Sequence, residues 1–259
     1  MAEPPTQTAP ESAGANADTA LFQLEQRVVA VWATRRARVL YRALRLLVRL
    51  LGRTYLRTRV VGAARLRQPG AFIIAPVHRS NLDAPLVNGL CPGPVRSLAK
   101  REMFAGSVGT WVSAMLGCYP VQRGMSDRRS LQAAVDVISR GRPMLVFPEG
   151  TRQSGHRVGE IFGGTAFLAA HAGVPIVPVG IAGTEEAMAP GARFIRPGPV
   201  TIVVGEPLAP PATQGRASSD ARRRFTAELH QAMQQAMDQA VELAQRRRQR
   251  LRLRRAGRP

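Results

Sequence analysis

Short apolar runs alternate with helical patterns through the middle of the chain, from about residue 60 to about residue 210. Short, mainly apolar runs, typical of buried strands, cover 71–75, 144–147, 176–181 and 200–204, with a weaker one at 96–99. Helical patterns cover 82–90, 102–117, 128–140 and 162–172. Gly141 and Gly173 follow two of these segments as C-cap residues do. The alternation predicts an α/β fold with a mixed, mostly parallel sheet that helices cover on both faces.

The N-terminal flank divides into two parts. Residues 1–20 are rich in Ala, Pro and Thr without periodicity, and we expect them to be disordered. Residues 21–53 have a helical pattern with leucines around a basic stripe, which consists of Arg38, Arg42, Arg45, Arg49 and Arg53. A basic stripe on an apolar helix is typical of an amphipathic helix that lies in the interface of an anionic bilayer. The alternative is a helix packed on the domain with a solvated arginine face.

The C-terminal flank is a long helical pattern that begins near Ser219 and becomes almost entirely cationic at residues 245–250. Positive charge complements the end of a helix dipole, so the basic end is either a solvated helix terminus or a second membrane contact. The chain therefore divides into a disordered segment (1–20), an amphipathic membrane-associating region (21–59), an α/β domain (60–215) and a basic helix (216–259).

Composition limits the class of protein. With 259 residues, 45% of them hydrophobic, the chain can bury one sizeable core. Its net charge of +20 calls for an anionic partner or surface, and we expect anionic membrane lipids. Nucleic acid is not expected as the partner, because aromatic residues make up only 5% of the chain and are not interleaved with the basic run.

Membrane spans and secretion are not expected from the pattern. No run approaches 18 consecutive apolar residues, and the first residues lack the basic and apolar regions of a secretory signal. Cys91 and Cys118 have no metal-ligand spacing, so a reducing cytosol fits better than a disulfide framework. We expect a peripheral protein at the cytoplasmic face of the cell membrane.

The first candidate for chemistry is the pair His78 and Asp83. Five positions apart on one continuous helix, these side chains would lie about 140° apart and would not meet. They can meet if His78 lies in the turn before the helix and Asp83 in its first turn. The carboxylate would then hold the imidazole tautomer so that the other nitrogen accepts a proton. The alternative is a capping box from Ser80 to Asp83 beside an ordinary turn histidine.

A second polar segment, residues 147–152, follows a predicted strand. Glu149 falls at the carboxyl end of that strand, where sites in α/β sheets cluster. Gly150 permits a turn or a close approach of a ligand, and Arg152 has the planar fork that suits phosphate. Alternatively, Glu149 and Arg152 pair with each other. Between the two segments, Arg123 is either a second phosphate ligand or a loop cation.

These segments together resemble a known family. His78-x4-Asp83, Arg123 after a short apolar segment, 147–152 and 176–181 are similar to the four ordered blocks of the glycerolipid acyltransferases. The closest type is 1-acyl-sn-glycerol-3-phosphate acyltransferase. Lys100 also falls where such enzymes often carry an Ala-Lys-x-Glu segment. The resemblance covers about residues 60–210 and implies that 60–215 is the catalytic domain.

The resemblance implies acyl transfer from acyl-CoA or acyl carrier protein to the sn-2 hydroxyl of 1-acyl-sn-glycerol 3-phosphate, giving phosphatidic acid in phospholipid biosynthesis. No cofactor beyond this co-substrate and no metal are implied. His78 would be the general base and Asp83 its orienting partner. The implied substrate-binding residues are Lys100, Arg123, Glu149, Gly150, Thr151 and Arg152. The same chemistry on glycerol 3-phosphate or another lysolipid stays open, because Gly163 stands where many members have Lys.

Overall fold

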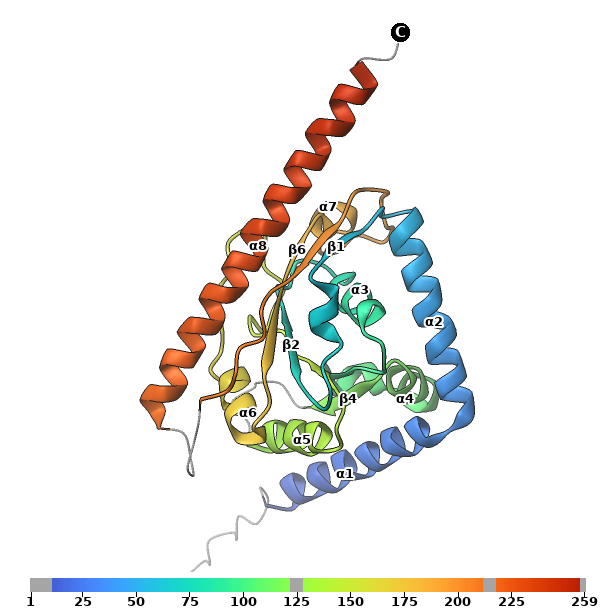
Figure 1. Cartoon of the computed structure of the whole chain (residues 1–259). Helices are drawn as coiled ribbons and strands as arrows, with labels where there is room; N and C mark the ends of the chain where they lie inside the picture. The colour runs from blue at the N-terminus through green and yellow to red at the C-terminus, as the bar shows by residue number, and fades with distance from the viewer. Residues whose placement is uncertain (1–10, 122–127, 212–217, 257–259) are drawn as a thin grey trace, which may run out of the picture.

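The computed structural model describes residues 11–121, 128–211 and 218–256 (Figure 1). Strands form a seven-stranded sheet in the order β1-β7-β6-β2-β5-β3-β4, and all neighbours run parallel except β6 and β7. The strands are β1 (Arg59–Val61), β2 (Ile73–Pro76), β3 (Arg96–Lys100), β4 (Cys118–Val121), β5 (Met144–Leu145), β6 (Ile176–Ala182) and β7 (Thr201–Val204). The predicted α/β class with a mostly parallel sheet is confirmed.

Helices precede, connect and follow these strands. The helices are α1 (Glu11–Ala33), α2 (Arg35–Thr54), α3 (Asp83–Leu90), α4 (Gly106–Met115), α5 (Arg128–Ser139), α6 (Gly164–Ala172), α7 (Thr184–Ala187) and α8 (Ser219–Ala256). Two short 3-10 helices, η1 (Ala63–Leu66) and η2 (Arg101–Phe104), complete the described elements. α1 and α2 run along two sides of the domain, and α8 extends beyond it (Figure 1).

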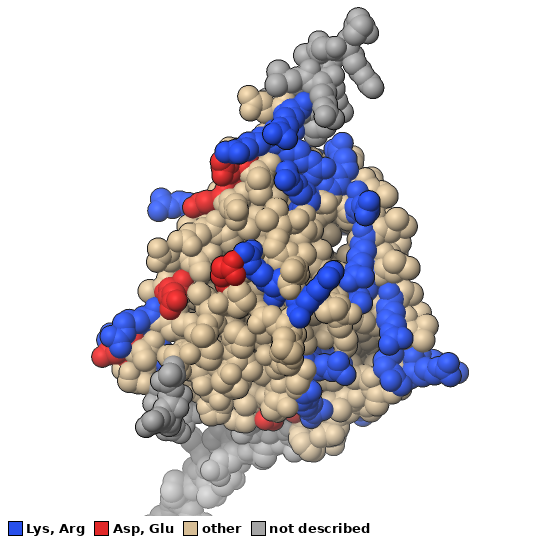
Figure 2. Space-filling view, in the orientation of Figure 1, with Lys and Arg blue, Asp and Glu red and all other residues tan. Residues whose placement is uncertain are grey.

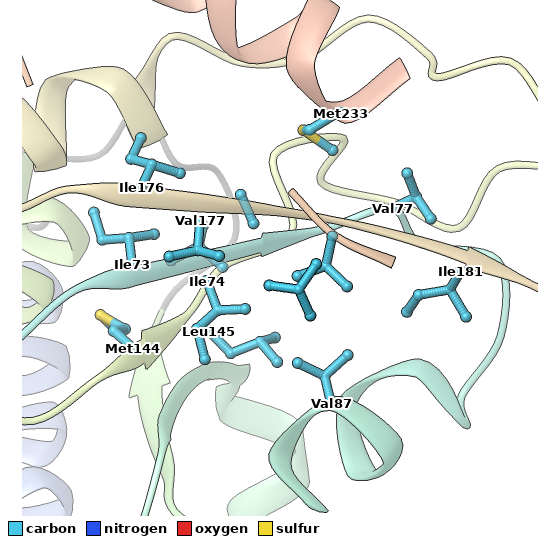
Figure 3. Close-up of a cluster of buried hydrophobic side chains, with 14 of the residues drawn as sticks. Ile73, Ile74, Val77, Val87, Met144, Leu145, Ile176, Val177, Ile181 and Met233 are labelled. Carbon is cyan, nitrogen blue, oxygen red and sulfur yellow. The ribbon is translucent and has the colours of Figure 1, made fainter. Parts of the chain in front are cut away.

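The core lies on both faces of β2 and β6, whose residues are all buried. Figure 3 shows Met233 of α8 on one side of these strands and Val87 of α3 on the other. The closest approach is at Gly180 of β6, where an added Cβ would lie 2.2 Å from the carbonyl oxygen of Ala236. The backbone of α8 therefore rests directly on the sheet, and the predicted coverage of both faces is found.

The N-terminal flank differs from the prediction. α1 already begins at Glu11, although the sequence predicted disorder up to residue 20; several alanines in this stretch favour a helix. The single helix predicted over 21–53 is broken at Thr34, whose Oγ1 caps α2 by accepting a hydrogen bond from the Ala37 N–H at 3.2 Å. Periodicity continues through this break, so the pattern alone did not reveal it.

The short edge strands were also missed. β1 has three residues and β4 has four, and each pairs with only one neighbour in the sheet. β5 spans two residues rather than the predicted four, because the chain leaves the sheet toward Pro148 to form the polar loop. Val146 still donates a hydrogen bond to the Ile74 carbonyl at 2.9 Å, so the loop starts from a fixed point.

The basic stripe of α2 does not all point outward. Arg45 donates hydrogen bonds to the carbonyls of Gly93 and Pro92 at 2.8 and 2.9 Å, and Arg49 donates to that of Cys91 at 3.0 Å. These carbonyls follow the C-terminus of α3, where cations complement the helix dipole. Two members of the stripe therefore anchor α2 to the domain, in place of the headgroup contacts that the sequence predicted for them.

The outer face of α2 is apolar. Its exposed large apolar side chains are Val39, Leu40, Leu46, Leu47, Leu50 and Leu51. Figure 2 shows Lys and Arg gathered along α2 and at the end where α8 leaves the domain. Within the described parts of the chain, none of the helices has the length and apolar character needed to cross a membrane.

Candidate active site

The candidate site lies at the carboxyl ends of β2 and β5, which are adjacent and parallel. His78 follows β2 by two residues, and Glu149 follows β5 by four. Parallel neighbours deliver their outgoing loops to the same edge of a sheet, which is where α/β proteins bind ligands. The two polar segments singled out from the sequence are therefore brought together in space.

His78 and Asp83 are in contact, as predicted for the case in which His78 lies in the turn and Asp83 begins the helix. His78 Nδ1 lies 3.2 Å from Asp83 Oδ2, and α3 begins at Asp83. The carboxylate is fully buried, whereas the imidazole side chain is 18% exposed. With Nδ1–H donating to the carboxylate, Nε2 is left to accept a proton. The ring also stacks on Phe147, with 3.8 Å between the ring centroids, which fixes its plane.

Asp83 is held by the backbone in front of it. Its Oδ2 accepts hydrogen bonds from the N–H groups of Arg79 and Ser80, both at 2.6 Å. Only one of the two hydrogen bonds of a capping box is present, the one from Ser80 N–H to the Asp83 carboxylate. The other would join Asp83 N–H to Ser80 Oγ, but Asp83 N–H donates to the Ser80 carbonyl, and Ser80 Oγ donates to the Met188 carbonyl at 2.7 Å. The turn and the first residue of α3 thus form one rigid unit around the imidazole.

Glu149 is buried and fully engaged with the protein. Only 1% of the residue is exposed, and both carboxylate oxygens accept hydrogen bonds from Arg79 Nη1, at 3.0 and 2.9 Å. Oε2 also accepts the His78 N–H at 2.8 Å, and Oε1 accepts the Gly159 N–H at 2.9 Å. The alternative pairing of Glu149 with Arg152 is therefore not formed, and each oxygen of the carboxylate already has protein donors.

Arg79 is the functional residue that the sequence reasoning missed. It is 1% exposed and donates further hydrogen bonds at 2.8 Å to the carbonyls of Gly155 and Arg157. It therefore ties the turn after β2 to the long loop after β5. No periodicity marks this role. The available signal was Glu149 itself, since a carboxylate directly after an apolar strand needs a cation nearby if it is buried.

The rest of the second segment, residues 150–152, is exposed. Gly150 has a φ of +68°, and an added Cβ would lie 2.8 Å from the Phe162 ring, so the turn requires glycine. Thr151 is exposed, and its Oγ1 accepts a hydrogen bond from Gln153 at 3.1 Å. Arg152 is exposed, and its Nη1 donates to Asn81 Oδ1 at 3.2 Å, which places a cation beside the turn that carries His78.

The structure describes the other two predicted substrate ligands, Lys100 and Arg123, only in part or not at all. Lys100 is the last residue of β3, so its backbone lies at the same carboxyl edge, two strands from β2. Its side chain and the whole of Arg123 lie outside the described residues.

Gly163, where many family members have Lys, precedes α6 and borders a cavity of about 440 Å³, whose other lining residues are Ser219, Arg222, Arg223 and Thr226.

Comparisons with known proteins agree with this arrangement. The acyltransferase family model matches residues 57–182, which include both polar segments. A 1-acyl-sn-glycerol-3-phosphate acyltransferase of Chlamydomonas reinhardtii is 31% identical over 66% of the chain and 52% of its own length. A lyso-ornithine lipid O-acyltransferase of Pseudomonas aeruginosa is 34% identical over 56% of each chain. The matched part thus spans about half the length of these two relatives.

A solved structure shows the same fold. The crystal structure of the 1-acyl-sn-glycerophosphate acyltransferase PlsC from Thermotoga maritima superposes with a TM-score of 0.63. The superposition covers 86% of this chain and 90% of that one, at 23% sequence identity. The ordered blocks and the family match lead to one conclusion: residues 57–182 form a domain of the acyltransferase family.

Proposed function

We propose that this protein transfers a fatty acyl group from a thioester to the sn-2 hydroxyl of 1-acyl-sn-glycerol 3-phosphate, giving phosphatidic acid. The donor is acyl-CoA or acyl carrier protein. The observation that carries the proposal is the contact between the imidazole of His78, which is 18% exposed, and the fully buried carboxylate of Asp83. A base oriented in this way, next to an exposed arginine, suits a hydroxyl nucleophile with a phosphate nearby.

The reaction follows from this geometry. His78 Nε2 takes the proton of the acceptor hydroxyl as its oxygen attacks the thioester carbonyl carbon. The imidazolium then gives that proton to the departing thiolate, while the carbonyl re-forms as the new ester. Asp83 stabilises the imidazolium between the two steps, and a positioned base of this kind contributes about 10²–10⁴ in rate. Proximity of the two bound substrates supplies much of the remainder.

The acceptor phosphate is assigned to Arg152, together with Lys100 and Arg123, which the family resemblance implies. Arg152 is exposed and contacts Asn81, three residues after His78 in the same turn. Glu149 is assigned a positioning role, because an anionic carboxylate that is already saturated by Arg79 has no reason to contact phosphate. Gly150 and Thr151 shape the loop that presents Arg152.

A second acceptor has support from one relative and one residue. The Pseudomonas aeruginosa relative is named for lyso-ornithine lipid, and Gly163 offers no cation where many family members have one. Another lysolipid acceptor is therefore the alternative to 1-acyl-sn-glycerol 3-phosphate. The catalytic assignment of His78 and Asp83 is the same for either acceptor.

The test supplies the purified protein with an acyl-CoA and a panel of lysolipids that includes lyso-ornithine lipid. Thiol release and the lipid product are followed together. His78→Ala and Asp83→Ala should lower kcat by about 10² or more. His171→Ala removes an exposed histidine of α6 and should behave like the wild type. Full activity in His78→Ala would exclude the general-base assignment.

The second partner is the surface of an anionic membrane, with the protein held peripherally at the cytoplasmic face. The support is the exposed apolar face of α2 with arginines along its border. Replacing Leu46, Leu47, Leu50 and Leu51 by Ser should release the protein from anionic vesicles, since each leucine is worth up to about 1.5–3 kcal/mol when buried. Unchanged sedimentation with vesicles would refute this partner.

A further inference from the structure

Three arginines come together where α8 passes the start of β1: Arg57, Arg59 and Arg247, called here the Arg57 cluster. Arg247 Nη1 donates a hydrogen bond to the Arg57 carbonyl at 2.5 Å. Burial, and then the charges of Arg57 and Arg59, lower the pKa of Arg247. Arg57 also has a φ of +44°, a conformation that residues with a Cβ rarely adopt. The fold thus holds three like charges against one another.

Among the described residues, no carboxylate lies within salt-bridge distance of any guanidinium of the Arg57 cluster. The residues on either side of Arg247 are ion-paired instead: Arg246 pairs with Glu242, and Arg248 pairs with Glu186. Arg247 thus differs from the arginines on either side of it, because no carboxylate among the described residues compensates its charge. Arginine forks in this arrangement favour a ligand with several phosphate oxygens.

The Arg57 cluster lies at the same edge of the sheet as the candidate active site. Arg59 is level with Thr201 of β7, and Thr201 is level with Ala182 at the end of β6. On the other side of β6, Pro76 is level with Val179, so His78 reaches the same height. Three inter-strand steps of about 4.8 Å separate β2 from β1, which gives roughly 14 Å along the edge.

This separation decides which phosphate the cluster can hold. We infer that the Arg57 cluster binds the phosphate groups at the carrier end of the acyl-CoA donor, an inference that rests on the proposed function. The acceptor phosphate is only a few bonds from the reacting hydroxyl and cannot lie so far from His78. The donor phosphates are separated from the thioester by the pantetheine arm. That arm is comparable to four or five amino-acid residues, roughly 13–18 Å when extended.

The compactness of the cluster favours coenzyme A over a broad surface. Arg247 is half-buried against Arg57, and the adjoining arginines on α8 are neutralised by their own carboxylates. A bilayer or an acidic carrier protein matches charge that is spread over many exposed residues. A small site with concentrated charge matches the nucleotide end of coenzyme A instead.

The test compares two triple variants that lose the same charge. Arg57→Gln/Arg59→Gln/Arg247→Gln removes the cluster, whereas Arg140→Gln/Arg246→Gln/Arg248→Gln removes one exposed and two ion-paired arginines. The cluster variant should raise the KM for acyl-CoA by about tenfold or more, with kcat and the KM for lysolipid changed less than about twofold. The control variant should keep all three constants within about twofold.

Direct binding separates this inference from the proposed function. Calorimetry on the His78→Ala protein, with adenosine 3′,5′-bisphosphate as the probe, should detect binding that the added cluster substitutions abolish. An unchanged KM for acyl-CoA in the cluster variant overturns the inference. So does a loss confined to anionic vesicles, which would make the cluster a lipid contact, or a loss confined to acyl carrier protein. If the wild type acylates no lysolipid, the proposed function fails, and the calorimetry still decides the phosphate site.

Discussion

Glu149 distinguishes a residue that organises the site from one that contacts substrate, so its replacement by Gln is the most informative single change. The carboxylate balances the charge of Arg79, and both residues are only 1% exposed. Glu149→Gln keeps the shape and removes the charge, which leaves a buried guanidinium without its counter-ion. Breaking a buried pair from one side typically costs about 3–5 kcal/mol of unfolding free energy.

For a chain of this length, each kcal/mol shifts Tm by roughly 2–4 °C, so Glu149→Gln should lower Tm by about 6–20 °C. Replacing both partners, as Arg79→Met/Glu149→Leu, removes both buried charges and should recover much of that stability. Activity should not recover, because the His78 N–H and the Gly159 N–H lose the oxygens that fix them. Stability and catalysis therefore respond differently to the double change.

The assays are thermal unfolding followed by circular dichroism and steady-state kinetics over both substrates. A positioning role predicts a lower kcat with little change in the KM of the acceptor. It also predicts that Glu149→Gln adds little further loss of activity in the His78→Ala background, since residues that act through one another are not additive. A Tm near that of the wild type, combined with a raised KM for the lysolipid, would refute the reasoning and restore Glu149 as a substrate ligand.

Two other changes follow from the packing. Gly180→Ala forces a Cβ into the α8 backbone and should lower the unfolding free energy by about 1–3 kcal/mol or more. Gly198→Ala, which places its Cβ in open space, should not lower it, and urea unfolding of the two variants makes the comparison. Burial raises the pKa of the Cys91 thiol to about 12 and also raises the pKa of Cys118, so neither should react with Ellman's reagent at mildly alkaline pH before the protein unfolds. Early reaction would contradict this burial.

The interior of the sheet was predictable from the sequence, and its polar edge was only partly so. β6 was predicted to within one residue and α3 began one residue after its predicted start, because continuous apolar runs and capping patterns respond to burial directly. Arg79 was missed because its partner, Glu149, lies 70 positions away and no periodic signal joins them. The break at Thr34 was missed because the helical period continues across it.

The meeting of His78 and Asp83 depends on the same local detail. Their five-residue spacing works only because α3 begins at Asp83 and the turn before it folds back onto the carboxylate. That carboxylate has two roles, since it accepts two backbone N–H groups and also faces the imidazole. An alanine substitution removes both roles and cannot tell them apart.

Asp83→Asn separates the two roles. The amide oxygen can still accept hydrogen bonds from the Arg79 and Ser80 N–H groups, so the turn should persist and Tm should fall by only a few degrees. The neutral amide cannot stabilise an imidazolium on His78, and kcat should fall by about 10² or more, in line with the loss of about 10⁴ known for the equivalent change in a Ser-His-Asp triad. Near-normal turnover in Asp83→Asn, beside an inactive Asp83→Ala, would mean that the carboxylate serves only the turn. The charge would then have no part in the proton transfer, and the base would act through its position alone.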